Sequence, residues 1–102
     1  MKEIHKVELL APARNLECGR EAIKHGADAV YIGAARFGAR AAAGNSVEDI
    51  AELARFAHLY YARVYVTVNT ILKDSELAET EALVWDLYRA GVDAILVQDM
   101  AV

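Results

Sequence analysis

Polar residues follow two short apolar runs of this chain, at the points where buried strands would end. Asn69 comes directly after Val64–Val68, and Gln98 and Asp99 follow Ala94–Val97. A carboxylate in such a place is suited to general-base chemistry or to orienting a substrate. The Asn69 amide is suited to donating to a substrate oxygen. Structural alternatives stay open, because an aspartate also caps a helix or braces a loop and an asparagine also completes a turn.

Three more polar residues extend this candidate site. Arg40 and Asn45 lie in the glycine-rich stretch 33–45, where an arginine suits a carboxylate or phosphate, or is simply solvated. Glu8 falls in the first strand-like run. If its carboxylate faces the interior of the fold, it needs a partner or a proton. We therefore predict a set of substrate-binding residues and assign no catalytic residue. The set is Glu8, Arg40, Asn45, Asn69, Gln98 and Asp99.

Other chemistries lack the residues that they need. One cysteine, Cys18, excludes an internal disulfide and a cysteine-based metal site within the chain. The histidines are scattered, so we predict no metal site and no cofactor within these residues. The glycines at 33, 38 and 44 match neither a dinucleotide fingerprint nor a P-loop. No Ser–His–Asp or Cys–His set of a known protease is visible in the sequence.

A repeated phrase indicates the elements that position these residues. Residues 25–32 read HGADAVYI and residues 90–97 read AGVDAILV, 65 positions further on. In each, a glycine ends a helix-like segment and an apolar run follows, which is typical of a helix leading into a buried parallel strand. Asp28 and Asp93 precede the strands, at the end opposite to the candidate site, so we predict structural roles for both.

We predict an α/β fold with parallel βαβαβαβ order. Strands are expected near residues 7–11, 29–32, 64–68 and 94–97, and helices near 16–25, 47–61 and 76–90. Pro12 should stop the first strand. Right-handed crossovers place such strands side by side, and the arrangement resembles the first half of a TIM-type barrel. We expect residues 1–102 to form a single partial barrel segment, the N-terminal fragment of a longer protein.

The composition narrows the setting of the protein. The chain has 102 residues, of which 56% are hydrophobic and 25% charged, as expected for one globular domain. A net charge of −4 does not indicate a basic surface for nucleic-acid phosphates. No apolar run is long enough to span a membrane, so we expect no membrane partner and a cytoplasmic location. The first and last strands would be unpaired edges, and we expect the chain to associate as a homodimer.

Five blocks of sequence carry a family resemblance. They are ELLAPA at 8–13, GADAVYIG at 26–33, FGAR at 37–40, VYVTVNT at 64–70 and GVDAILVQD at 91–99. In this order they resemble the start of the collagenase-like peptidase family, whose catalytic type was never assigned. The resemblance implies an N-terminal β/α barrel in a longer protein. It also implies, for several members, an iron–sulfur cluster on cysteines that lie downstream of the matching residues.

The resemblance leads to three functional expectations. The main one is a hydrolase, the N-terminal fragment of a collagenase-like peptidase that acts on peptides, with no activity of the fragment alone. The alternative is a non-proteolytic protein of RNA hydroxylation or of the ubiquinone pathway, which acts with a downstream iron–sulfur cluster. The third is an association unit that has no activity of its own.

Overall fold

The computed structural model describes residues 8–35, 44–70 and 74–99 and has three helices alternating with the strands of one sheet. The strands are β1 (Leu10–Ala13), β2 (Ala29–Gly33), β3 (Arg63–Thr70) and β4 (Ala94–Asp99), and the helices are α1 (Leu16–Lys24), α2 (Val47–Leu59) and α3 (Asp74–Arg89). The strands lie in the order β1-β2-β3-β4, and every pair is parallel. The predicted βαβαβαβ order is therefore confirmed.

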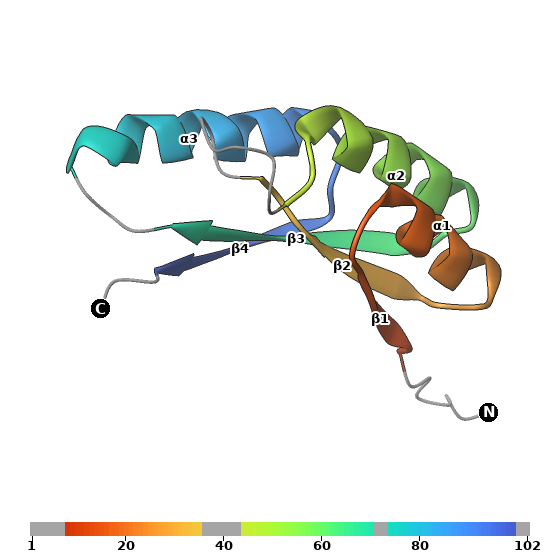
Figure 1. Cartoon of the computed structure of the whole chain (residues 1–102). Coiled ribbons are helices and arrows are strands. Elements are labelled where there is room, and N and C mark those ends of the chain that lie inside the picture. The colour runs from red at the N-terminus through yellow and green to blue at the C-terminus, as the bar shows by residue number, and fades with distance from the viewer. Residues whose placement is uncertain (1–7, 36–43, 71–73, 100–102) are drawn as a thin grey trace, which may run out of the picture.

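All three helices cover the same face of the sheet (Figure 1). Alternate strand residues point to that face, and Val30, Ile32, Val64 and Val66 are at most 1% exposed there. The helices contribute the buried side chains Ile23, Ile50, Leu53 and Leu87. Burial of each such aliphatic side chain stabilises the fold by about 1.5–3 kcal/mol. The hydrophobic core thus lies between the helices and one side of the sheet.

The opposite side of the sheet has no helix over it (Figure 1), and we call it the open face. Its side chains alternate along each strand with those of the core. By this alternation and the strand register, the open face carries Leu10, Pro12, Ala29, Tyr31, Gly33, Arg63, Tyr65, Thr67, Asn69, Ala94, Leu96 and Gln98. The sheet therefore presents a mixed polar and aromatic surface on the side away from the core.

The turns from helix to strand share a left-handed residue. Gly26 follows α1 with φ +105°, and Gly91 follows α3 with φ +92°, which is the conformation that favours glycine after a helix. Tyr61 occupies the equivalent position after α2 with φ +61°. A side chain there costs roughly 1–2 kcal/mol. The glycines of the repeated phrase thus occupy positions that require a positive φ, and the turn after α2 is strained because Tyr61 occupies that position.

The structure corrects the predicted position of the first strand. β1 runs from Leu10 to Ala13, not over 7–11, and Glu8 precedes it. Pro12 lies inside β1 and does not stop it. This is possible because β1 is at the edge of the sheet, where a proline nitrogen that cannot donate leaves no ladder bond unmade.

The later strands are longer than predicted. The parallel pairing of β3 and β4 continues through Asn69↔Gln98 and Thr70↔Asp99. Asn69, Gln98 and Asp99 are therefore strand residues, although their polarity indicated loops. Backbone pairing accommodates the side chains of Asn69 and Gln98 because the open face leaves them in solvent. At the helices, α2 ends at Leu59, before the predicted residue 61, and α3 already begins at Asp74.

Candidate functional site

Two side-chain amides stand next to each other at the carboxyl end of the open face. Asn69 of β3 and Gln98 of β4 are register partners, so their strands hold them about 4.8 Å apart. Both are exposed. Neither side chain has a hydrogen-bond partner in the parts of the chain that the structure describes. Together they offer acceptors and donors to a ligand, and we call them the amide pair.

Two further rows of residues lie below the amide pair on the open face. The next row of the open face holds Gly33, Thr67 and Leu96, and the row below it holds Tyr31 and Tyr65. Gly33 has no side chain, and Thr67 Oγ1 lies 3.5 Å from the position that a Cβ atom would take there. Leu96 is 52% exposed. A planar ligand held by the amide pair would therefore find a hydroxyl group and an apolar side chain beneath it.

Asn45, which the sequence analysis also assigned to substrate binding, braces the neighbouring loops. Its Nδ2 donates to the carbonyl oxygen of Arg14 at 3.1 Å and to that of Gly33 at 2.9 Å. Its backbone N–H donates to the same Gly33 carbonyl at 2.9 Å. Both amide hydrogens are used in joining the segment after β1 to the end of β2. Only Oδ1 remains for a ligand.

The remaining predicted residues fall in different places. Asp99 is the last residue of β4, directly after Gln98, and its register partner is Thr70 of β3. Arg40 lies outside the described residues. Glu8 lies at the amino end of the sheet, where its Oε2 accepts from the Tyr65 hydroxyl at 3.4 Å. Tyr65 and Asn69 are four residues apart along β3, about 13 Å at strand geometry. The structure thus brings Asn69 and Gln98 together and places Glu8 away from them.

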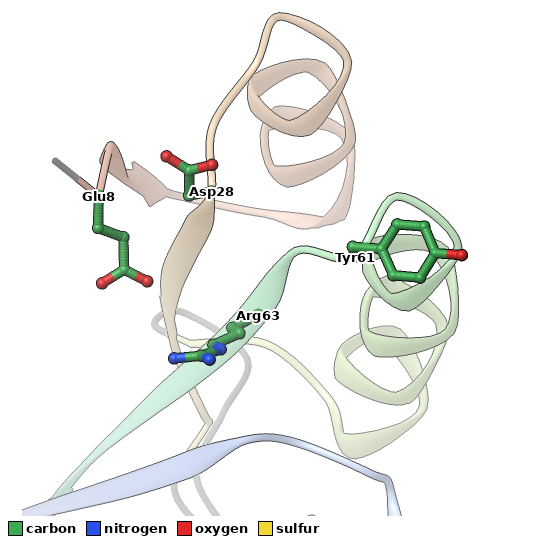
Figure 2. Close-up of a pocket in the computed structure, with 4 residues that line it drawn as sticks. All are labelled: Glu8, Asp28, Tyr61 and Arg63. Carbon is green, nitrogen blue, oxygen red and sulfur yellow. The ribbon is translucent and has the colours of Figure 1, made fainter. Parts of the chain in front are cut away.

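The amino end of the open face is an ionic cluster. A cavity of about 350 Å³ is lined by Glu8, Asp28, Tyr61 and Arg63. Figure 2 shows Glu8 and Arg63 extending into this space, while the Tyr61 ring points outward. The Tyr65 side chain, through a hydrogen bond and its electrostatic interaction, and the negative charge of Glu8 raise the pKa of the Arg63 guanidinium above its ordinary value. The arginine stays charged at this end of the face.

The repeated aspartates bind backbone groups of preceding strands. Asp28 Oδ2 accepts from the Leu9 N–H at 2.9 Å, and Asp93 Oδ2 accepts from the Val64 N–H at 2.8 Å. Asp93 Oδ2 also lies 2.9 Å from His58 Nε2. Each aspartate thus links the start of its own strand to that of the strand before it. The contacts agree with the structural roles predicted for Asp28 and Asp93.

The sequence analysis missed Tyr31, Tyr65 and Thr67 as members of the open face. The signal was present in the pattern VYVTVN at 64–69, which alternates apolar and polar residues with a period of two. That alternation places Tyr65, Thr67 and Asn69 on one side.

The described ranges contain neither a cluster of metal-ligating side chains nor a membrane-spanning helix. No group of three His, Cys, Asp or Glu side chains there is placed to hold a metal ion. Across the same residues, no helix has the length and apolar character needed to cross a bilayer.

Comparisons with known proteins identify relatives of the chain. The family model described as peptidase family U32 matches residues 14–102. A protein of Escherichia coli (strain K12) named 23S rRNA 5-hydroxycytidine C2501 synthase is 59% identical over 98 residues, which cover 96% of this chain and 15% of that protein. The tRNA hydroxylation protein P1 of Bacillus subtilis (strain 168) is 43% identical, over 92% of this chain and 22% of its own length.

A relative named for proteolysis is more distant. The collagenase of Porphyromonas gingivalis (strain ATCC BAA-308 / W83) is 31% identical, over 96% of this chain and 24% of its own length. The chain thus spans between about a seventh and a quarter of the length of these three relatives. No solved structure matches the chain significantly.

These comparisons correct the main functional expectation. The predicted role as a collagenase-like peptidase, and with it the hydrolase and protease description, is wrong. The relatives at 59% and 43% identity are named for RNA hydroxylation, whereas two relatives named for proteolysis are 39% and 31% identical. The peptidase expectation depended on the name of a family whose members differ in activity. The alternative of a non-proteolytic RNA-hydroxylation protein is favoured instead.

Proposed function

We propose that this chain, which belongs to peptidase family U32, forms part of the RNA site of a protein that hydroxylates cytidine at carbon 5. The observation that carries the proposal is the 59% identity over 98 residues to the 23S rRNA 5-hydroxycytidine synthase. The relationship to a tRNA hydroxylation protein adds to it. We also propose a cytoplasmic location for the protein, which agrees with an RNA substrate.

The position of the amide pair supports this proposal. In parallel β/α folds, ligands bind at the carboxyl ends of the strands, and Asn69 and Gln98 lie at that end. They are exposed and have no partner among the described residues. Substrate contacts by Glu8, Arg40, Asn45 and Asp99 stay predictions. We assign this chain a part in substrate binding, and no catalytic residue.

An iron–sulfur cluster does not fit the residues of this chain. Such a cluster is held by several cysteine thiolates, and the chain has a single cysteine, Cys18, which is exposed on α1. We therefore route no step through a cluster here. In our proposal, any cluster of the longer protein is bound by residues outside this chain.

A segment exchange tests the proposed function. In Escherichia coli lacking its C2501 synthase, the matching 98-residue segment of that enzyme is replaced by this chain. We expect the chimera to restore 5-hydroxycytidine in 23S rRNA, measured by mass spectrometry of the nucleosides. The control is the unmodified synthase expressed from the same vector. A chimera that accumulates to the control level and leaves C2501 unmodified would contradict the proposal.

We further propose that the isolated chain self-associates through its sheet edges. β1 and β4 are the outer strands of the sheet, and Leu10 and Val97 on them are 47% and 51% exposed. An uncovered edge favours pairing with another chain. Size exclusion with light scattering should show a dimer that Leu10→Lys weakens. A folded monomer at micromolar concentration would contradict this proposal.

A further inference from the structure

We infer that the amide pair of Asn69 and Gln98 binds the Watson–Crick edge of a pyrimidine base, with cytosine as the preferred base. The inference rests on the proposed function, because it names the part of the RNA that this chain contacts. It goes further in assigning two neutral side chains to one edge of one nucleotide. It also predicts which way the reacting carbon of the base points.

The first step of the argument is the chemistry of the two amides. A side-chain amide has one carbonyl acceptor and two N–H donors, and cytosine carries along one edge an N4 amine, the N3 acceptor and the O2 acceptor. Asn69 Oδ1 can accept from N4 while its Nδ2 donates to N3. Gln98 Nε2 can then donate to O2. Bidentate amide contacts to base edges are an established mode of recognition in nucleic-acid complexes.

The second step is the spacing and the freedom of the pair. Asn69 and Gln98 are register partners on adjacent parallel strands, so their backbones are about 4.8 Å apart and both side chains leave the same face. Neither side chain is held by a described neighbour. Both can therefore turn to match one planar edge. Asn45, in contrast, has donated both amide hydrogens to Arg14 and Gly33.

The third step is the surface on which the base would lie. Leu96 stands one row below Gln98 and is 52% exposed, and Thr67 stands beside it. An apolar side chain next to two amides that have no partner among the described residues suits the flat ring of a base and its polar edge. A base reaches such a face only when it is unstacked, as in RNA loops or when it is flipped out. The expected ligand is therefore single-stranded or loop RNA.

The orientation of the base follows from this contact. Carbon 5 lies on the side of the pyrimidine ring that does not carry N3 and O2. When the Watson–Crick edge faces Asn69 and Gln98, carbon 5 points away from the amide pair. The amide pair then orients the base, and the groups that modify carbon 5 must approach from the side of the base that is remote from Asn69 and Gln98.

The side-chain amides themselves allow a direct test. The 102-residue chain has four of them, Asn15, Asn45, Asn69 and Gln98, so its NH₂ resonances are few enough to assign. The ¹⁵N-labelled chain is titrated with a short single-stranded RNA containing one cytidine, and in parallel with the same RNA carrying an abasic site there. We expect the cytidine RNA to shift the NH₂ signals of Asn69 and Gln98. Asn15, which accepts from the Cys18 N–H at 2.8 Å as it caps α1, serves as the internal control.

The possible results separate the interpretations. Shifts at Asn69 and Gln98 with the cytidine RNA alone support the inference. Equal shifts with both RNAs would mean phosphate or sugar contact, and no shift would mean no contact, so either overturns it. A chimera that hydroxylates C2501 while these signals stay unmoved would disprove base binding by the pair and leave the proposed function intact. Cytidine-dependent shifts together with an inactive chimera would support base binding by the pair and contradict the proposed function.

A second measurement does not depend on the isolated chain. The purified chimera is titrated with fluorescently labelled versions of the cytidine RNA and the abasic RNA. The ratio of the two affinities measures the contribution of the base. We expect the intact chimera to prefer the cytidine RNA by roughly five- to tenfold or more. The double variant Asn69→Ala/Gln98→Ala should lose that preference and keep its affinity for the abasic RNA. An unchanged preference in the double variant overturns the inference.

Discussion

The two ends of the sheet use polar side chains in opposite ways. At the amino end, Asp28 and Asp93 bind the backbone N–H groups of Leu9 and Val64. At the carboxyl end, Asn69 and Gln98 have no partner within the described residues. A polar group with a partner contributes to stability, and its removal leaves another group unsatisfied. We therefore expect substitutions at the amino end to affect folding and substitutions in the amide pair to affect binding.

The largest loss of stability is expected for Asp93→Ala. This change removes the acceptor of the Val64 N–H and the partner of His58. Leaving the partly buried N–H unsatisfied should cost about 1–3 kcal/mol, which is a fall in melting temperature of several degrees for a chain of this size. Thermal unfolding followed by circular dichroism measures it.

The matched control is Asp86→Ala. Asp86 forms an exposed pair with Arg89 at 3.0 Å on α3, and such pairs contribute at most about 1 kcal/mol. The comparison of the two ends would lose its basis if Asp86→Ala were as destabilising as Asp93→Ala.

A smaller effect separates two asparagines at the same end of the sheet. Asn45→Ala removes the donors to the carbonyls of Arg14 and Gly33 and should cost about 1 kcal/mol. Asn69→Ala removes no described contact and should change stability by less than about 0.5 kcal/mol. Urea unfolding of the two variants measures the difference. Equal losses in the free energy of unfolding would contradict the view that the hydrogen bonds of an amide, and not its position in the sheet, decide its contribution to stability.

An effect of similar size sharpens the comparison at the turns into the strands. Tyr61 holds φ +61° where the other two turns have glycine, and its side chain is 95% exposed. Tyr61→Gly should relieve the strain and lose little packing. Tyr61→Ala keeps a Cβ atom and hence the strain. We expect the glycine variant to be more stable than the alanine variant by about 1 kcal/mol. The opposite order in thermal unfolding would contradict the account of this turn.

The sequence predicts the order of elements well because the signals for it are local. The phrase around Gly26 and its copy around Gly91 contain the end of a helix, the turn and the start of a strand within eight residues. The structural roles of Asp28 and Asp93 follow from their place in that phrase. The ends of β3 and β4 were predicted too early because polar residues that face solvent on a strand resemble loop residues.

The parts of the site that depend on distant contacts could not be predicted. The partners of Asn45 are 12 and 31 residues away, so no local pattern reveals its bracing role. Glu8 was expected inside a strand, but it precedes β1 and reaches Tyr65, 57 residues further along. The neighbourhood of Asn69 and Gln98 depends on the register of β3 with β4. Function was mispredicted for another reason, because one family holds relatives named for proteolysis and for RNA hydroxylation.

The central claim is that the amide pair serves RNA and not the fold. The measurement that tests it most directly places Asn69→Ala/Gln98→Ala in the chimera with the Escherichia coli synthase and records both the melting temperature and the 5-hydroxycytidine content of 23S rRNA. The account predicts an unchanged melting temperature and a loss of at least tenfold in 5-hydroxycytidine. Full hydroxylation by the double variant, or a loss explained by its unfolding, would contradict the claim.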